Sequence, residues 1–367
     1  MNKLFVVVFL IALSAMAQGG ATAVSPVPSE RVDGGVVYRG LIVHNVDGLV
    51  SAPDGRVLFR RAGTIVHGVF DEHGRRMNEN STGVELRFVL RGDSVRLRLG
   101  GDTDRSVSPI RIHYGDVEGD WPDNVRMVIG RDDEIAIPRR QAARRKGDRF
   151  DPSVVRLVLP HGKLGIRDVI GDIEPPSAAL LPAKTYLAYG SSITHGSTAY
   201  VIEECYASLV GKALGADVRN LGFAGCARME REMADFIAMQ KFDFATLEMG
   251  VNVVSGMPER EYEDRIRYFI RRIAESHPQA TILAIDIFGW MTGRPDDDRA
   301  GRYRKVLARV VAEIGCPNVT YVNGLDLLPN DTEISLGGGL HPTSAGHRLI
   351  AENILERFRR IKERKGQ

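Results

Sequence analysis

The pattern of hydrophobic and polar positions divides the chain into two halves. Between residues 36 and 159, apolar and charged residues alternate with a period of two, as in residues 84–90 and 95–99. This alternation is typical of half-buried antiparallel strands. The polar residues 91–94 between these two stretches predict a turn, and the stretches themselves a hairpin. Several such strands, separated by Gly and Asp, predict a β-sandwich over residues 30–175.

The pattern changes after residue 175. Three prolines between residues 175 and 182 cannot continue a helix or a sheet ladder, so residues 176–183 are expected to be a linker. Within residues 184–362, short apolar stretches alternate with helical periods. Such an order predicts a parallel, three-layer α/β domain that binds ligands at the carboxyl ends of its strands. The expected strands are 186–189, 218–221, 244–248, 281–287 and 319–322, with helices around 266–273 and over 345–362.

The first residues resemble a targeting signal. Lys3 precedes an apolar run over residues 4–13, which leads to the small-residue site Ala15-Met16-Ala17. Residues 1–17 are therefore expected to be a signal peptide, and the mature protein to be secreted or periplasmic. The run is shorter than the roughly 20 residues of a membrane span, so no span is expected after cleavage, and an uncleaved anchor is the alternative.

Composition narrows the classes of function. Forty-nine Lys and Arg against 47 Asp and Glu give a net charge of +2, which is too balanced to predict nucleic acid as a partner. The basic segment 139–149 is most simply a solvated loop, with an anionic-polysaccharide contact as the alternative. Cys205, Cys226 and Cys316 are too few and too scattered for a zinc site, although one bridge between Cys205 and Cys226 is considered. No cluster of ligands indicates a metal or another cofactor, and none is expected.

Four residues at successive strand-to-helix junctions carry candidate chemistry. Ser192 follows the first strand of the α/β half, Gly225 the second and Asn252 the third, while His341 precedes the last helix. Each alone has an ordinary explanation as a cap, a turn or a surface residue, and Ser191 is a candidate helix cap. Together they supply the nucleophile, the oxyanion donors and the general base of acyl transfer.

The amino-acid sequences of these segments resemble those of a known family, the SGNH or GDSL-type hydrolases. The segments are Tyr-Gly-Ser-Ser-Ile-Thr-His-Gly, Asn-Leu-Gly-Phe-Ala-Gly, Gly-Val-Asn-Val and Leu-His-Pro, which are similar to a subgroup with an N-terminal β-sandwich. The resemblance implies a flavodoxin-like sheet of five parallel strands. It also implies that Ser192 attacks an ester carbonyl while His341 takes its proton, and that the Ser192 and Gly225 backbone N–H groups and the Asn252 side chain hold the oxyanion.

Two residues depart from the family's pattern. Ser191 stands where the first block has Asp, and Gly338 occupies the place of the Asp that orients the imidazole. In serine proteases, replacement of the equivalent Asp lowers kcat by about 10⁴. Three outcomes remain open: a Ser–His dyad aided by a backbone carbonyl, a substitute carboxylate from Asp331 or Glu333, or an inactive protein.

The expected function is a secreted serine esterase that hydrolyses small O-acyl esters, most plausibly acetyl esters on carbohydrate. The alternatives are an acyltransferase that uses the same acyl-enzyme, and a non-catalytic glycan-binding protein. A turn or capping role is expected for Asp286 and a structural role for His347. His195 is more plausibly a helix-face residue than a substrate contact, and Trp290 could wall a substrate pocket.

Overall fold

The computed structural model describes residues 25–101, 109–117, 125–126, 133–289, 297–330, 335–336 and 339–366. The expected signal peptide at 1–17, Trp290, Asp331, Glu333 and Gly338 lie outside these residues. Among the described residues, no helix is long and apolar enough to cross a membrane.

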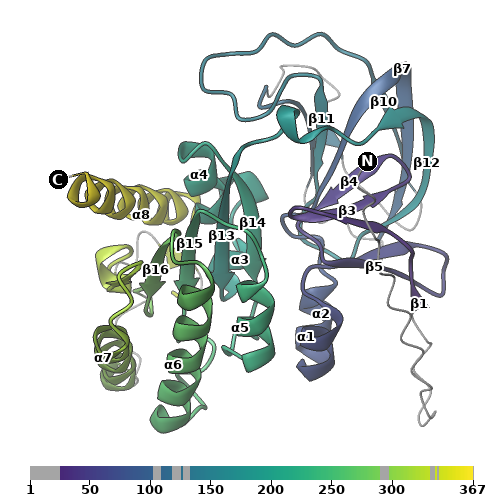
Figure 1. Ribbon diagram of the computed structural model, residues 1–367. Coiled ribbons are helices and arrows are strands. Elements are labelled where there is room, and N and C mark those ends of the chain that lie inside the picture. The colour runs from purple at the N-terminus through teal and green to yellow at the C-terminus, as the bar shows by residue number, and fades with distance from the viewer. Residues whose placement is uncertain are drawn as a thin grey trace, which may run out of the picture.

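The first half of the chain is an antiparallel all-β domain (Figure 1). Its strands belong to one bent sheet, a half-barrel, whose inward side chains, such as Phe59, Phe88 and Leu157, are buried in a single core. The predicted all-β domain ahead of an α/β domain is thus confirmed. The strands are β1 (Ser25–Pro26), β2 (Glu30–Val32), β3 (Gly35–Tyr38), β4 (Leu41–His44), β5 (Gly48–Ser51), β6 (Val57–Arg60), β7 (Glu85–Gly100), β8 (Ile110–Tyr114), β9 (Val125–Arg126), β10 (Asp133–Pro138), β11 (Val154–Val158) and β12 (Gly165–Glu174).

The hairpin predicted around residues 91–94 is wrong, because residues 85–100 form the single strand β7. The first part of β7 pairs with β4 and β11, and the second part pairs with β10 and β12. The pairing with β12 slips across residues 91–94, where the Arg139 guanidinium donates to the carbonyl of Gly92 at 3.0 Å. A bulge that keeps the chain extended carries the same polar residues as a turn, so the sequence pattern does not separate the two.

Two short helices, α1 (Thr64–Val69) and α2 (Glu72–Asn78), interrupt the all-β half. The sequence analysis did not predict them. Val66 and Phe70 leave the β core and join the core of the second half, where Phe70 lies 5.4 Å from Phe223 between ring centroids. Figure 1 shows α1 and α2 alongside α5 (Arg231–Ala238).

The second half holds a five-stranded parallel sheet in the order β14-β13-β15-β16-β17. This is the flavodoxin-like order, as the resemblance implied. Along the chain, the short 3₁₀ segment η1 (Ala178–Leu180) lies between β12, the last strand of the first sheet, and the first strand of the second sheet. The strands are β13 (Lys184–Gly190), β14 (Ala216–Gly222), β15 (Phe244–Glu248), β16 (Thr281–Ile285) and β17 (Val319–Val322), and a two-stranded ribbon joins β18 (Ser335–Leu336) to β19 (His341–Pro342).

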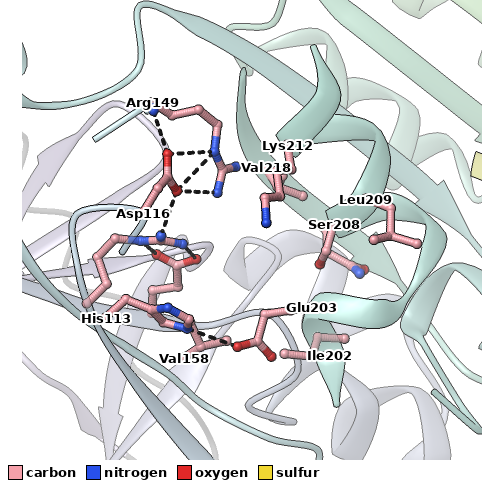
Figure 2. Close-up of a pocket in the computed structure, with 14 residues that line it drawn as sticks. His113, Asp116, Arg149, Val158, Ile202, Glu203, Ser208, Leu209, Lys212 and Val218 are labelled. Atoms are coloured by element: carbon pink, nitrogen blue, oxygen red, sulfur yellow. Dashed lines mark hydrogen bonds and ion pairs between the residues drawn. The ribbon is translucent and has the colours of Figure 1, made fainter. Parts of the chain in front are cut away.

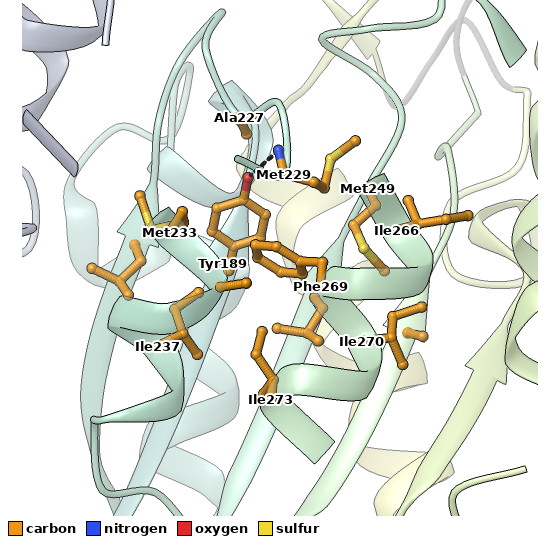
Figure 3. Close-up of a cluster of buried hydrophobic side chains, with 14 of the residues drawn as sticks. Tyr189, Ala227, Met229, Met233, Ile237, Met249, Ile266, Phe269, Ile270 and Ile273 are labelled. Atoms are coloured by element: carbon orange, nitrogen blue, oxygen red, sulfur yellow. Dashed lines mark hydrogen bonds between the residues drawn. The ribbon is translucent and has the colours of Figure 1, made fainter. Parts of the chain in front are cut away.

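Helices cover both faces of the parallel sheet, which explains why its strands are apolar almost throughout. One face packs against α5, α6 (Glu259–Ser276) and α7 (Asp297–Ile314), with Tyr189 and Phe269 at its centre (Figure 3). The other face packs against α4 (Tyr206–Ala213) and α8 (Ser344–Lys365). The remaining short elements are α3 (Ser192–His195), η2 (Ile202–Glu204) and η3 (Gly324–Asp326).

The free edge of β14 faces the all-β domain (Figure 1). Four alternate carbonyls along this edge accept hydrogen bonds from side chains of that domain. Arg149 donates to Ala216 at 3.2 Å, His44 to Val218 at 2.8 Å, Asn45 to Asn220 at 3.0 Å and Arg61 to Gly222 at 2.8 Å. The edge that would otherwise be open to another strand is therefore satisfied by side chains.

A chain of buried ion pairs reinforces this interface. Arg87 binds Asp217 of β14 through two bonds of 2.7 Å and also contacts Glu85 at 2.8 Å. Glu85 binds Arg156, which reaches Asp116. Asp116 is also the partner of Arg149 (Figure 2). The basic segment 139–149 is thus only partly solvated, because its last residue belongs to this network.

The three cysteines are free thiols, so the bridge considered between Cys205 and Cys226 is wrong. Cys205 lies at the start of α4 near the Ser208 hydroxyl (3.4 Å), whereas the Cys226 sulfur faces the carbonyl of Ala224 (3.4 Å). The spacing of two cysteines in the sequence does not show whether their side chains meet in the fold. Cys316 is half-buried at the border of the core.

The interface makes a prediction about Asp217. Burial acts to raise the pKa of this carboxyl, but the charge and hydrogen bonds of Arg87 outweigh it and lower the pKa from 3.8 to about 2. Its contribution to stability is therefore complete above pH 3.8 and is lost as the pH falls toward 2. Asp217→Asn should cost about 3 kcal/mol of unfolding free energy at pH 7, because it leaves Arg87 with one partner fewer in a buried site.

Urea unfolding at pH 7 and at several values down to pH 2 measures this effect. The matched control is Asp168→Asn, which removes an exposed ion pair with Arg39 and should cost less than about 1 kcal/mol. Equal stability of the two variants would refute the role of Asp217.

Candidate active site

Ser192 begins α3 directly after β13. The Ser191 hydroxyl caps the helix by accepting from the backbone N–H of Ile193 at 3.2 Å, as the sequence suggested. Gly190 must be small, since a Cβ there would lie 2.4 Å from Glu248 Oε2 and 2.2 Å from Thr194 Oγ1. The tight turn holds Ser192 at the carboxyl end of the parallel sheet on rigid backbone.

Glu248 lies beneath this turn and was missed by the sequence analysis. Its Oε2 accepts from the Ser191 backbone N–H at 2.5 Å and from the Thr194 hydroxyl at 3.2 Å, while burial raises its pKa. The side chain is fully enclosed at the end of β15. An acid that ends an otherwise apolar strand was the available signal.

His341 meets Ser192 although 149 residues separate them in the chain. The two side chains are joined by a hydrogen bond of 2.7 Å between Ser192 Oγ and His341 Nε2. Burial lowers the pKa of His341, which favours the neutral ring. A neutral ring with its proton on Nδ1 accepts the Ser192 proton through Nε2.

No acceptor lies on His341 Nδ1 among the residues that the structure describes. Burial alone lowers the pKa of His341, and no carboxylate of the described residues acts on the ring. Asp331 and Glu333, considered as substitutes for the missing Asp, fall outside the described part of the chain, as does Gly338. Within these limits, the arrangement is a Ser–His pair.

The loop that contains Gly225 is bonded at one end to the nucleophile turn and at the other to Asn252. Gly225 has a positive φ of 73°, which favours glycine. It lies in the loop that begins at Phe223, whose N–H donates to the carbonyl of Gly190 at 2.8 Å. Asn252 Oδ1 accepts from the Ala227 N–H at 3.0 Å. This bond leaves the Asn252 amide nitrogen as the donor, and it has no acceptor among the described residues.

Two further residues were not anticipated. Thr198 has a φ of 72°, a strained value for a β-branched residue, and its hydroxyl donates to the carbonyl of Pro342 at 2.6 Å. It therefore ties the His341 segment to the end of α3. From the all-β domain, His73 Nε2 donates to the carbonyl of Ala224 at 2.7 Å and lies 3.0 Å from where a Gly225 Cβ would be.

The other candidate polar residues have structural partners. The buried His195 ring contacts the carbonyl of Gly222 at 3.1 Å and the Thr82 hydroxyl at 3.0 Å. Asp286 accepts from the N–H of Gly324 at 2.6 Å and from the Tyr321 hydroxyl at 2.5 Å, and burial raises its pKa to about 6. His347 accepts from the Tyr206 N–H at 3.4 Å. In the described ranges, no group of His, Cys, Asp or Glu could hold a metal ion.

Comparison with known proteins agrees with this geometry. Residues 188–349 match the GDSL-like lipase/acylhydrolase family. This part of the chain, which contains Ser192, Gly225, Asn252 and His341, is therefore similar to that family. No curated protein matches the chain.

Several solved structures share the fold at low sequence identity. A salicylyl-acyltransferase from a tetracycline biosynthetic pathway has a TM-score of 0.72 and 19% identity, covering 89% of this chain and 95% of its own. A family two carbohydrate esterase from Clostridium thermocellum, in complex with cellohexaose, has a TM-score of 0.57 and 15% identity, covering 89% and 99%. An acetyl xylan esterase from Butyrivibrio proteoclasticus has a TM-score of 0.52 and 16% identity, covering 77% and 90%. Each of the three matches covers more of this chain than the α/β half alone, so each includes part of the all-β half.

The Thr198 contact generates a prediction. Thr198→Val keeps the shape of the side chain but removes the hydroxyl, which should loosen the His341 segment and lower kcat for a small ester about tenfold, the value of one hydrogen bond. Thr198→Ser keeps the hydroxyl and should retain activity within about twofold. Steady-state kinetics with 4-nitrophenyl acetate measure both variants, and equal rates for the Val variant and the wild type would rule out this positioning role.

Proposed function

We propose that the protein is a secreted serine esterase that removes small acyl groups, chiefly acetyl, from carbohydrate through a Ser–His dyad. The observation that carries the proposal is the 2.7 Å hydrogen bond between Ser192 Oγ and His341 Nε2 at the carboxyl end of a parallel sheet. The carbohydrate and acetyl assignments are supported by the names of the two esterase neighbours. The signal-like residues 1–17 support export.

The reaction begins when Ser192 Oγ bonds to the ester carbonyl carbon and its proton moves to His341 Nε2. The carbonyl electron pair shifts to the oxygen, which is held by the Ser192 and Gly225 backbone N–H groups and the Asn252 amide. Collapse of this intermediate breaks the bond to the sugar oxygen, which takes the proton from His341. Water then attacks the acyl-enzyme, passes a proton to His341, and releases the carboxylic acid as Ser192 recovers its proton.

The position of Thr198 supports the dyad. Without a carboxylate on Nδ1, the imidazole needs another means of orientation, and the bond from Thr198 to Pro342 fixes the backbone next to His341. The Pro342 ring limits the same backbone further.

An acyltransferase with the same acyl-enzyme is the second candidate, favoured by the fold of the salicylyl-acyltransferase neighbour. The two functions differ in whether water or an alcohol attacks the acyl-enzyme. Incubation with acetylated xylan and a tenfold excess of free xylo-oligosaccharide separates them, since free acetate indicates hydrolysis and new acetylated oligosaccharide indicates transfer. If the protein instead binds glycans without catalysis, which is the third hypothesis, neither product is formed.

The nucleophile is tested by covalent labelling. A fluorophosphonate probe should add one mass increment to the intact protein at Ser192, and Ser192→Ala should abolish labelling and lower acetate release by about 10⁴ or more. Ser208→Ala, a half-buried serine on α4, is the matched control and should label like the wild type. A properly folded protein that is not labelled would exclude the serine esterase.

The pH dependence tests the dyad. Because burial lowers the pKa of His341 and no carboxylate among the described residues opposes this, the base is neutral at lower pH than an ordinary histidine. The rise of kcat/KM with pH should therefore have its midpoint below 6.5. A midpoint above 7 would indicate a carboxylate on Nδ1. Circular dichroism over the same pH range controls for unfolding.

A further inference from the structure

A cavity lies between the two domains, at the end of β13 opposite to Ser192. It has a volume of about 470 Å³ and is bordered by the turn between β2 and β3, the first residues of β13 and β14, and the segment after α5. Because the strands of the α/β sheet are parallel, this cavity is at the amino ends of β13, β14 and β15, whereas Ser192 follows the carboxyl end of β13. We call it the amino-end cavity.

Arg219 lines this cavity and makes no close ion pair with a described residue, although the charges of Asp47 and Asp217 act on it from a longer distance. The residue is 3% exposed, yet its Nε is buried without a hydrogen-bond partner among the described residues. Burial lowers the pKa of Arg219 to about 10, so the side chain is still charged at neutral pH. A buried guanidinium normally has its donors satisfied, and an unsatisfied one is costly.

The carboxylates around Arg219 are engaged elsewhere. Asp47 binds Arg31 at 2.7 Å, and Asp217 binds Arg87 at 2.7 Å. On the rim, Asp33 pairs with Lys241 at 2.9 Å, and Asp243 accepts from the Thr185 N–H at 2.8 Å.

His44 borders the same space with an unsatisfied acceptor. Its Nε2 donates to the carbonyl of Val218, and burial lowers its pKa to about 4, so the ring is neutral and Nδ1 has a bare lone pair. No donor among the described residues reaches Nδ1. Gly34 keeps the space open, because a Cβ there would lie 3.1 Å from His44 Nδ1 and 3.8 Å from Arg219 Nη1.

We propose that the amino-end cavity binds a hydroxy acid, with its carboxylate on the Arg219 guanidinium and a neighbouring hydroxyl donating to His44 Nδ1. Arg219 supplies a fork of donors that fits two carboxylate oxygens. His44 supplies an acceptor that a hydroxyl satisfies and a plain anion does not. The volume exceeds what a single inorganic ion fills and suits a polyhydroxy carboxylate such as a sugar acid. Hydrogen phosphate also carries both a negatively charged group and a hydroxyl, but it is a smaller molecule.

Calorimetric titration of the full-length protein at pH 7 tests this proposal with four probes: D-glucuronate, inorganic phosphate, sulfate and glucose. Glucuronate should bind at millimolar concentration or below, and sulfate and glucose at least tenfold more weakly, since sulfate lacks the hydroxyl and glucose lacks the charge. Binding of phosphate but not glucuronate would overturn the sugar-acid assignment. Equal binding of glucose, or no binding of any probe at 20 mM, would overturn the site.

Variants locate the binding. Arg219→Met removes the charge with little change in volume and should weaken glucuronate binding about tenfold or more. Lys241→Met, whose ammonium group borders the same cavity but is exposed, is the matched control and should change binding less than about twofold. Retained binding in the Arg219 variant would refute the proposal. Should that variant unfold, a crystal of the wild type soaked in glucuronate decides, and a cavity holding only water would count against it.

Discussion

The structure depends on how the free edge of β14 is satisfied. A parallel sheet that ends in an open strand exposes a row of carbonyls, and in this protein four of them receive side-chain donors from the all-β domain. Arg61 supplies one of these bonds and also stacks 4.6 Å from the Phe223 ring. Because Phe223 opens the loop that contains Gly225, the same contacts that close the sheet also hold one wall of the candidate site.

The candidate site combines local and distant contributions. The turn at Gly190 and the cap at Ser191 are determined within a few residues of Ser192. The partner His341 arrives through the β18–β19 ribbon and is held by Thr198. Glu248 supports the turn from below, where its buried carboxyl occupies the Ser191 N–H. That N–H is therefore not free to bind a substrate oxygen, and the proposed oxyanion donors are the neighbouring Ser192 N–H and the Gly225 N–H.

Local patterns predicted much of the molecule. The strands at 244–248 and 319–322 have the bounds that their apolar runs suggested, and both faces of their sheet are buried. The residues at the strand ends were predictable because parallel strands bring their carboxyl ends to one edge. The bent strand β7 was not, since its bulge carries turn-like residues. Contacts such as His44 with Val218 join residues 174 positions apart and leave no periodic trace in either segment.

The ion network around Phe150 has a consequence for inheritance. Its members Arg87, Arg149 and Arg156 surround one ring at 4.8, 5.3 and 4.0 Å. Arg87 binds the Asp217 carboxylate of β14 in the other domain, and Arg149 donates to the carbonyl of Ala216 there. A substitution of a charged residue in either domain would leave a charge in the other domain without its partner. In relatives that keep this ion network, substitutions in the two domains should therefore be correlated. The two domains should also be inherited together, and the α/β domain should not be found joined to unrelated modules.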